Sequence, residues 1–281
     1  MKEITEYRIS PPNKTTLGLA ELFRYRELFY FFTWRDIKVK YKQSLLGFAW
    51  AILQPLLLMV IFTVFFGTFL GVGDKVGTIP YALFNYSGLM FWGIFASGLN
   101  NAGNSMVSNS NIIKKIYFPR MIIPMSAILV AVFDFVIAFV VFLILAWSMS
   151  IYQGFTVNWI MIVILSPICV LLSIFATLGM GSLIASLNVK YRDFRYLIPF
   201  IIQVLFFLAP VIYPEDIVTE PLLKKVIALS PMYAPISLKN LMFDIPVDLT
   251  CMLISLASSL FFLIFGVYYF RKTEAYFADI A

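Results

Sequence analysis

The chain has 281 residues, of which 61% are hydrophobic and only 13% are charged, and its formal net charge is +6. Soluble domains carry about 25% charged residues, so this composition excludes a water-facing globular fold. There is no histidine and there are only two cysteines, which excludes imidazole catalysis and a histidine- or cysteine-based metal site. We therefore expect no catalytic residue, no metal and no cofactor in this chain.

Six apolar stretches predict an all-α polytopic membrane protein with six transmembrane helices. They cover residues 49–70, 79–106, 122–147, 159–187, 200–211 and 249–270. A helix of about 20 residues crosses the ~30 Å hydrocarbon core of a bilayer. The fifth stretch is the shortest and ends at Ala209-Pro210, so it needs residues 196–198 to span, or it is a broken helix.

The basic residues between these stretches alternate in abundance, which predicts the orientation of the chain. If the N-terminus is cytoplasmic, seventeen of the twenty-one Lys and Arg lie on the cytoplasmic side, leaving Lys75, Lys224, Lys225 and Lys239 outside. This predicts a cytoplasmic segment over residues 1–48, a transmembrane domain over 49–270 and a cytoplasmic tail over 271–281. Because topology accounts for the positive charge, no nucleic-acid partner is expected.

Residues 17–45 predict an amphipathic interfacial helix before the first span. The apolar run of residues 28–34 is too short to cross a bilayer, and Arg and Lys residues flank it on both sides. Such a helix can lie in the membrane surface while its cations meet anionic head groups. A docking surface for a cytoplasmic partner is the second interpretation, and the two are compatible.

The first span carries an aromatic stripe at spacings of three, one and three residues. Its members are Phe62, Phe65, Phe66 and Phe69, which this spacing places on one helical face. Packing against lipid or neighbouring helices is one interpretation. The other is a wall of aromatic platforms along a translocation path for sugars.

The second span is the most polar of the six and carries a stripe of amides and hydroxyls. Its members are Ser97, Asn100, Asn101, Asn104, Ser105 and Ser108. Because these groups are costly in contact with lipid, the stripe is expected to face protein or water. It indicates either hydrogen bonds between helices or a hydrated translocation path, and its neutral donors and acceptors suit polyols better than ions.

Asp134 lies at the middle of the third stretch and is the ionisable residue expected deepest in the membrane. A central Asp costs about 2.5–3.5 kcal/mol on insertion scales, so another group must offset it. No Lys or Arg is expected at comparable depth. A protonated or hydrogen-bonded structural Asp and a proton relay are the two interpretations.

Two further segments have recognisable patterns. In the fourth span Ser173, Thr177, Gly181 and Ala185 repeat every four residues beside Gly179, which is typical of a close helix contact face. Residues 214–246 form the longest outer segment. Residues 222–229 and 235–243 in it predict two short, apolar helices that re-enter the outer leaflet before the last span.

Four stretches carry a resemblance to a known family. They are Tyr41-Lys-Gln-Ser-Leu-Leu-Gly-Phe-Ala-Trp-Ala-Ile-Leu-Gln-Pro-Leu56, Asn109-Ser-Asn-Ile-Ile-Lys-Lys-Ile-Tyr-Phe-Pro-Arg120, Val132-Phe-Asp-Phe135 and Leu187-Asn-Val-Lys-Tyr-Arg-Asp-Phe194. In this order and spacing the chain resembles the membrane (permease) subunit of bacterial polysaccharide-export ABC transporters, the family that exports O-antigen, capsule and teichoic acid.

The resemblance implies a homodimer in the bacterial plasma (inner) membrane, two copies of a cytoplasmic ABC ATPase that bind ATP and Mg, and a lipid-linked glycan as substrate. No phosphate-binding loop motif occurs here, in keeping with ATP on another chain. By the resemblance, residues 109–120 form the coupling loop that touches the ATPase. Its expected contacts are Asn111, Lys114, Lys115, Ile116, Tyr117, Phe118, Pro119 and Arg120.

Three other functions remain open at this stage. A drug or small-lipid exporter of the same superfamily shares the expected architecture. A proton-coupled secondary transporter would depend on Asp134. A membrane-embedded glycan-modifying enzyme would need the outer acids Glu215, Asp216, Asp244 and Asp248 to converge.

Overall fold

The computed structural model describes residues 24–42, 47–77, 79–191, 193–274 and 277. Within those residues the regular structure is helical and contains no strand. The elements are α2 (Arg26–Lys42), α3 (Ala49–Phe62), the π-helix η1 (Thr63–Phe69), η2 (Val72–Lys75), α4 (Tyr81–Ser108), α5 (Ser110–Ile113), α6 (Ile122–Gln153), α7 (Trp159–Lys190), α8 (Phe194–Leu208), η3 (Glu215–Ile217), α9 (Pro221–Ala228), α10 (Tyr233–Leu238), η4 (Lys239–Phe243) and α11 (Leu249–Thr273).

Helices occupy all six positions at which the sequence predicts a span. Four of them are long and apolar enough to cross a membrane: Ala49–Phe69, α6, α7 and α11. The helix α4 has 28 residues but a more polar sequence, and α8 is an apolar helix of only 15 residues. The helix α8 includes residues 196–198 and ends at Leu208, just before Ala209-Pro210, but at ~1.5 Å per residue it is still shorter than the hydrocarbon core.

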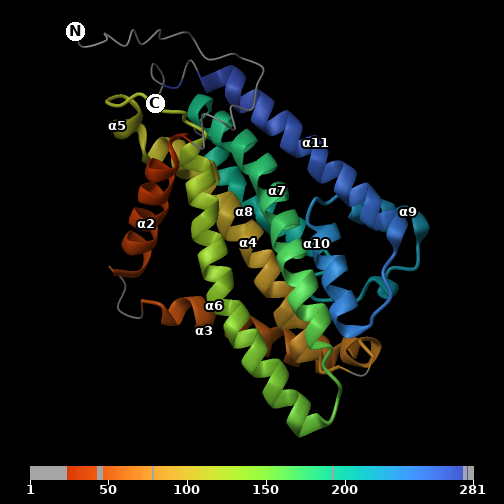
Figure 1. The fold of residues 1–281 in the computed structure, drawn as a ribbon. Coiled ribbons are helices and arrows are strands. Elements are labelled where there is room, and N and C mark those ends of the chain that lie inside the picture. Colours follow the sequence, from red (N-terminus) through yellow and green to blue (C-terminus); the bar gives the residue numbers. More distant parts are fainter. Residues whose placement is uncertain (1–23, 43–46, 78, 192, 275–276, 278–281) are drawn as a thin grey trace, which may run out of the picture.

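The core of the bundle forms where α4 packs between α6 and α7, with α11 against α7 (Figure 1). Small residues allow these close approaches. A Cβ added to Gly98 of α4 would lie 2.7 Å from Thr177, and one added to Gly181 would lie 3.0 Å from Ala102. The contact face predicted on the fourth span is therefore present: Thr177 and Gly181 pack on α4, whereas Gly179 packs on α11.

The N-terminal helix α2 flanks the first half of α6 (Figure 1). Phe32, Ile37 and Tyr41 form its buried face, while Phe31 and Trp34 are exposed. The sequence predicted a helix that lies in the membrane surface, and it did not predict that this helix packs along α6. Residues 17–23 and 43–45 of that prediction lie outside the described residues.

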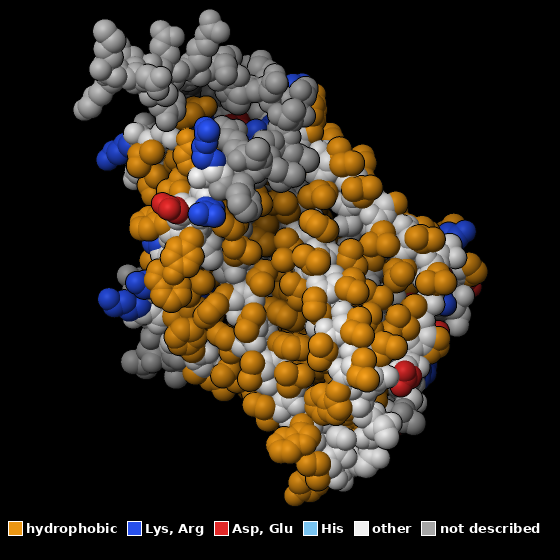
Figure 2. Space-filling model, in the orientation of Figure 1, with side chains coloured by type: hydrophobic (Ala, Val, Ile, Leu, Met, Phe, Trp, Pro, Cys, Tyr) orange, Lys and Arg blue, Asp and Glu red, His pale blue; other side chains and the backbone are white. Residues whose placement is uncertain are grey.

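The apolar surface of the bundle continues beyond α2. Figure 2 shows hydrophobic side chains over much of the visible face, with basic side chains near its upper left and right edges. On α6, large exposed hydrophobic residues recur every three or four positions: Val136, Val140, Ile144, Trp147 and Ile151. This pattern is expected of a helix face in contact with lipid.

The outer segment between α8 and α11 contains the two expected short helical regions, α9 and then α10 with η4. Proline opens α9 at Pro221, a position that tolerates it, whereas α10 begins two residues before Pro235. Lys239 was predicted among the outward-facing cations but is fully buried. Its ammonium lies 3.4 Å from the centroid of the Phe84 ring, so a cation–π contact replaces part of its hydration.

Candidate functional site

A cavity of about 630 Å³ lies among α2, α3, α4 and α6, with Ile202 of α8 at its edge. Its polar lining comes from Ser97 and Asn100 of α4, Gln54 of α3, and the charged pair described below. Its full lining is Lys40, Tyr41, Gly47, Trp50, Ala51, Gln54, Pro55, Leu58, Leu89, Met90, Trp92, Gly93, Ala96, Ser97, Asn100, Asp134, Phe135, Ala138 and Ile202. Aromatic faces beside neutral donors and acceptors form a surface suited to sugars.

The polar stripe of α4 divides between this cavity and the protein interior. Ser97 and Asn100 reach the cavity, and Asn101 donates to the Ser97 hydroxyl over 3.3 Å. Asn104 donates to the backbone carbonyl of Asn100 at 2.9 Å and accepts from Asn188 of α7 at 3.2 Å. Asn104 therefore makes a hydrogen bond between helices, whereas Ser97 and Asn100 face the cavity.

At the end of the stripe, Ser105 is buried and donates to the backbone carbonyl of Ala102 at 2.6 Å. The hydroxyl therefore has its hydrogen-bond partner within α4, and Ser105 does not line the cavity. Ser108, one turn further on, is exposed.

The aromatic stripe of the first span does not stay on one face. Phe62 stacks on Phe206 of α8 at 5.8 Å and meets Phe66 at 5.7 Å, whereas Phe65 and Phe69 are exposed and contact each other at 5.9 Å. The π-helix η1 causes this division, because its wider turn breaks the spacing on which the single face was predicted. None of the four rings lines the cavity described above.

Asp134 is not isolated. One carboxylate oxygen pairs with the ammonium of Lys40, and the other accepts a hydrogen bond from the Tyr41 hydroxyl. The expectation that no Lys or Arg reaches this depth was therefore wrong. The sequence did not show that α2 packs along α6, and this packing places Lys40 beside Asp134.

The loop between α4 and α6 presents a small basic and apolar surface. Asn111, Lys114, Lys115, Ile116 and Tyr117 are exposed, while Phe118 and Pro119 are buried. Arg120 fixes the end of the loop, because its backbone N–H donates to a Glu274 carboxylate oxygen at 2.9 Å and its guanidinium donates to the Glu274 carbonyl. The predicted contact residues therefore separate into an exposed group and an anchoring group.

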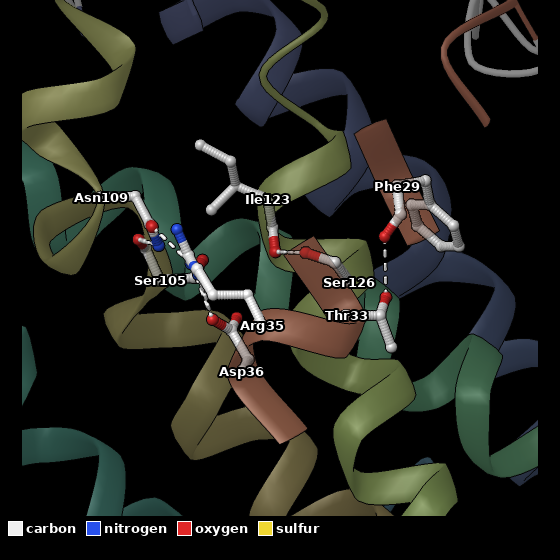
Figure 3. A network of polar contacts seen from close by, with 8 residues as sticks. All are labelled: Phe29, Thr33, Arg35, Asp36, Ser105, Asn109, Ile123 and Ser126. Atoms are coloured by element: carbon white, nitrogen blue, oxygen red, sulfur yellow. Dashed lines mark hydrogen bonds and ion pairs between the residues drawn. The ribbon is translucent and has the colours of Figure 1, made fainter. Parts of the chain in front are cut away.

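A polar network ties α2 to the start of this loop (Figure 3). Arg35 pairs with Asp36 at 2.7 Å and donates to the Asn109 side-chain oxygen at 2.8 Å. Asn109 in turn donates to the backbone carbonyl of Ser105 at 2.8 Å. Nearby, the rings of Phe32 and Phe118 lie 5.6 Å apart, so polar and apolar contacts join the same two segments.

Comparison with known proteins places these features in a family. The family model described as "ABC-2 type transporter" matches residues 27–242. The chain belongs to the ABC-2 type transporter family. That match covers α2 from residue 27, the cavity and the loop of residues 109–120, so these features belong to the ABC-2 domain.

Several curated proteins are similar to this ABC-2 chain over most of its length. A protein of Klebsiella pneumoniae named "O-antigen export system permease protein RfbA" is 27% identical over 95% of this chain and 98% of its own. Another of that name and organism is 31% identical over 74% of this chain and 75% of its own. One from Myxococcus xanthus, also so named, is 27% identical over 76% of this chain and 79% of its own.

Of the residues that line the cavity, the sequence predicted only Ser97, Asn100 and Asp134 as site residues, and it missed Lys40, Trp50 and Trp92 among the others. A signal for Trp92 was present, since Trp92, Ala96 and Asn100 follow at intervals of four and share one helical face. No comparable signal places Trp50 or Lys40, because their positions depend on how α2 and α3 pack against α6. Among the described residues, no group of three or more acidic or cysteine side chains is placed to hold a metal ion.

Proposed function

We propose that this chain is the transmembrane subunit of an ATP-driven exporter that moves a lipid-linked polysaccharide of the O-antigen, capsule or teichoic-acid type. The observation that carries the proposal is the cavity, where Trp50 and Trp92 lie beside the amides Gln54 and Asn100. Aromatic faces stack on pyranose rings and amides bond hydroxyls. The names of the similar Klebsiella and Myxococcus proteins support the same substrate class.

In this proposal two copies of the chain form the path across the bacterial plasma membrane, each with six spans and both termini in the cytoplasm. The helices α4 and α8 complete the set of six, and α9, α10 and η4 re-enter the outer leaflet. The exposed aromatic rings and lysines of α2 suit the head-group region of the cytoplasmic leaflet.

Two copies of a separate cytoplasmic ATPase drive this transport. They bind at the coupling loop, where Lys114, Lys115, Ile116 and Tyr117 offer exposed cations and apolar surface. Hydrolysis moves this loop, and the helices transmit the movement to the cavity. The chain supplies the path, and the chemistry belongs to its partner.

Reconstitution tests the proposal. The chain and its ATPase, placed in vesicles with a fluorescent lipid-linked glycan, should move the glycan across the bilayer when ATP is added. The chain without the ATPase should hydrolyse no ATP. Transport of small lipids or drugs with no movement of the glycan would instead identify a small-substrate exporter, and hydrolysis by the purified chain alone would overturn the assignment.

A further inference from the structure

The contact between α2 and α6 at the cavity is made by three side chains. Lys40 and Tyr41, neighbours near the end of α2, hold the two carboxylate oxygens of Asp134. All three line the cavity. The Lys40 and Asp134 side chains are 41% and 20% exposed, so the protein does not fully enclose the pair.

Aromatic packing fixes the corner between α2 and α3 at the same place. The Tyr41 ring stacks on Phe48 at 4.3 Å, with the planes 11° apart, and meets Phe133 of α6 at 6.0 Å. Phe48 directly precedes α3. The position of Tyr41 against α6 therefore determines where α3 begins.

Beyond that corner α3 is only partly packed. No residue of α3 or η1 is fully buried, although Leu56, Leu58 and Met59 pack partly against the core. Trp50, Gln54 and Leu58 of α3 nevertheless form one wall of the cavity. A wall without fully buried residues moves at lower cost than the core helices, and the corner restrains the end of α3 that begins at Ala49.

The middle of α2 is fixed to residues 109–120 through Arg35–Asn109 and Phe32–Phe118. Lys40 lies five residues beyond Arg35 in the same helix, roughly 7.5 Å along its axis. Because α2 is one continuous helix, a displacement of the loop moves Lys40 and Tyr41 as well.

We propose that Asp134 is a positioning residue for span one: with Lys40 and Tyr41 it forms a latch that holds the α3 wall of the cavity against α6. Movement of the coupling loop, carried along α2, opens and closes this latch. The role of the loop rests on the proposed function, whereas the effect of the latch on the cavity wall does not. Asp134 thereby has a mechanical task that needs no proton relay.

Labelling of a cysteine in the cavity tests the latch. Ala96→Cys places a thiol on the α4 wall, and a bulky charged maleimide reports how far the α3 wall stands open. In the chain held in lipid nanodiscs, we expect Asp134→Asn or Lys40→Gln to raise the labelling rate about two- to fivefold, since loss of a partly exposed ion pair shifts such an equilibrium by up to about this factor. The exchange Lys40→Asp with Asp134→Lys should restore slow labelling.

Matched controls separate the latch from a general loss of structure. Asp74→Asn and Lys75→Gln make the same chemical changes at exposed positions of η2 and should leave the rate unchanged. Cys169 and Cys251 are buried and report unfolding, so chains without Ala96→Cys should stay unlabelled. Equal labelling of wild type and Asp134→Asn, or failure of the exchanged pair to restore the rate, overturns the latch.

Addition of the ATPase and a non-hydrolysable ATP analogue tests transmission along α2. The analogue should change the labelling rate of the Ala96→Cys chain, and Asp134→Asn should abolish that dependence. If the labelling rate of the Ala96→Cys chain in complex with the ATPase is the same with and without the analogue, the transmission step is overturned. Because no glycan is present, these results are independent of whether the wild-type complex exports polysaccharide, which is measured in the vesicle assay.

Discussion

Tyr117 and Phe118 are neighbours in sequence but lie in opposite environments: Tyr117 is 70% exposed, whereas Phe118 is 4% exposed and packs on Phe32. The two rings therefore have separable roles in the coupling loop. Tyr117→Ala removes surface that is free to contact the ATPase and should change the stability of the chain by no more than ~0.5 kcal/mol. We expect it to weaken ATPase binding and to lower substrate-linked ATP turnover, measured on the reconstituted complex.

Phe118→Ala provides the contrast, because it empties a buried site between α2 and the loop. Loss of a buried aromatic side chain costs about 3–5 kcal/mol, so the melting temperature of the purified chain should fall before any partner is added. If Tyr117→Ala binds the ATPase and couples normally, the docking surface lies elsewhere. If Phe118→Ala melts like wild type, the packing described here does not stabilise the loop.

The polar stripe of α4 yields a second prediction. Asn100→Leu changes an exposed amide on the cavity wall, so the fold should persist while glycan export falls. Asn104→Leu instead removes one of the two acceptors of the buried Asn188 amide, the other being the Gly103 carbonyl, and should lower the melting temperature. Export assays and thermal melts on the two variants separate these effects. Normal export by Asn100→Leu would remove that residue from the path.

Much of the fold could be predicted from sequence because the signals are local. Helix positions follow from apolar stretches, and the break after α8 follows from Ala209-Pro210. The exposed part of the coupling loop also agrees with its basic sequence. The Gly179 and Gly181 region predicted a contact face, although it did not reveal which helix packs there.

Features that depend on packing between distant segments could not be predicted in this way. The partner of Asp134 is 94 residues away in the chain, and only the placement of α2 along α6 brings it near. The division of the phenylalanine stripe depends on the π-helix at Thr63–Phe69, which has no obvious sequence signal. Lys239 counts as an outward cation by topology, yet packing buries it over Phe84.

The contact between α7 and α11 gives a third prediction. A Cβ added to Gly266 would lie 2.0 Å from the carbonyl oxygen of Gly179, so Gly266→Ala must separate the two helices. Overpacking of this kind costs about 1–3 kcal/mol or more. Gly93→Ala is the matched control, because an added Cβ there meets nothing within 4 Å and helix propensity favours alanine. Thermal melts should show a lower melting temperature for Gly266→Ala alone, and an unchanged one would contradict the close approach.

The start of α11 gives the last prediction, which concerns pH. The Asp248 carboxylate accepts from the backbone N–H groups of Cys251 and Thr250, and mainly the Cys251 bond holds its pKa below the usual range. A carboxylate with a lowered folded-state pKa stabilises the fold above its unfolded pKa of about 3.9, and this contribution is lost as the pH falls through the folded value. Asp248→Ala should therefore cost about 1 kcal/mol at pH 7 and progressively less below pH 4.

Melting temperatures of wild type and Asp248→Ala, compared at pH 7 and near pH 3, measure that difference directly. Asp248→Asn keeps a capping oxygen without the charge, so its stability relative to wild type should depend on pH while remaining above that of Asp248→Ala at neutral pH. Asp216→Asn makes the same change at an exposed acid and should show neither effect. The lowered pKa of Asp248 requires that its ionised carboxylate gains more from the two N–H groups than its protonated form does. If wild type and Asp248→Ala differ in melting temperature by the same amount at both pH values, the charge of Asp248 does not stabilise α11.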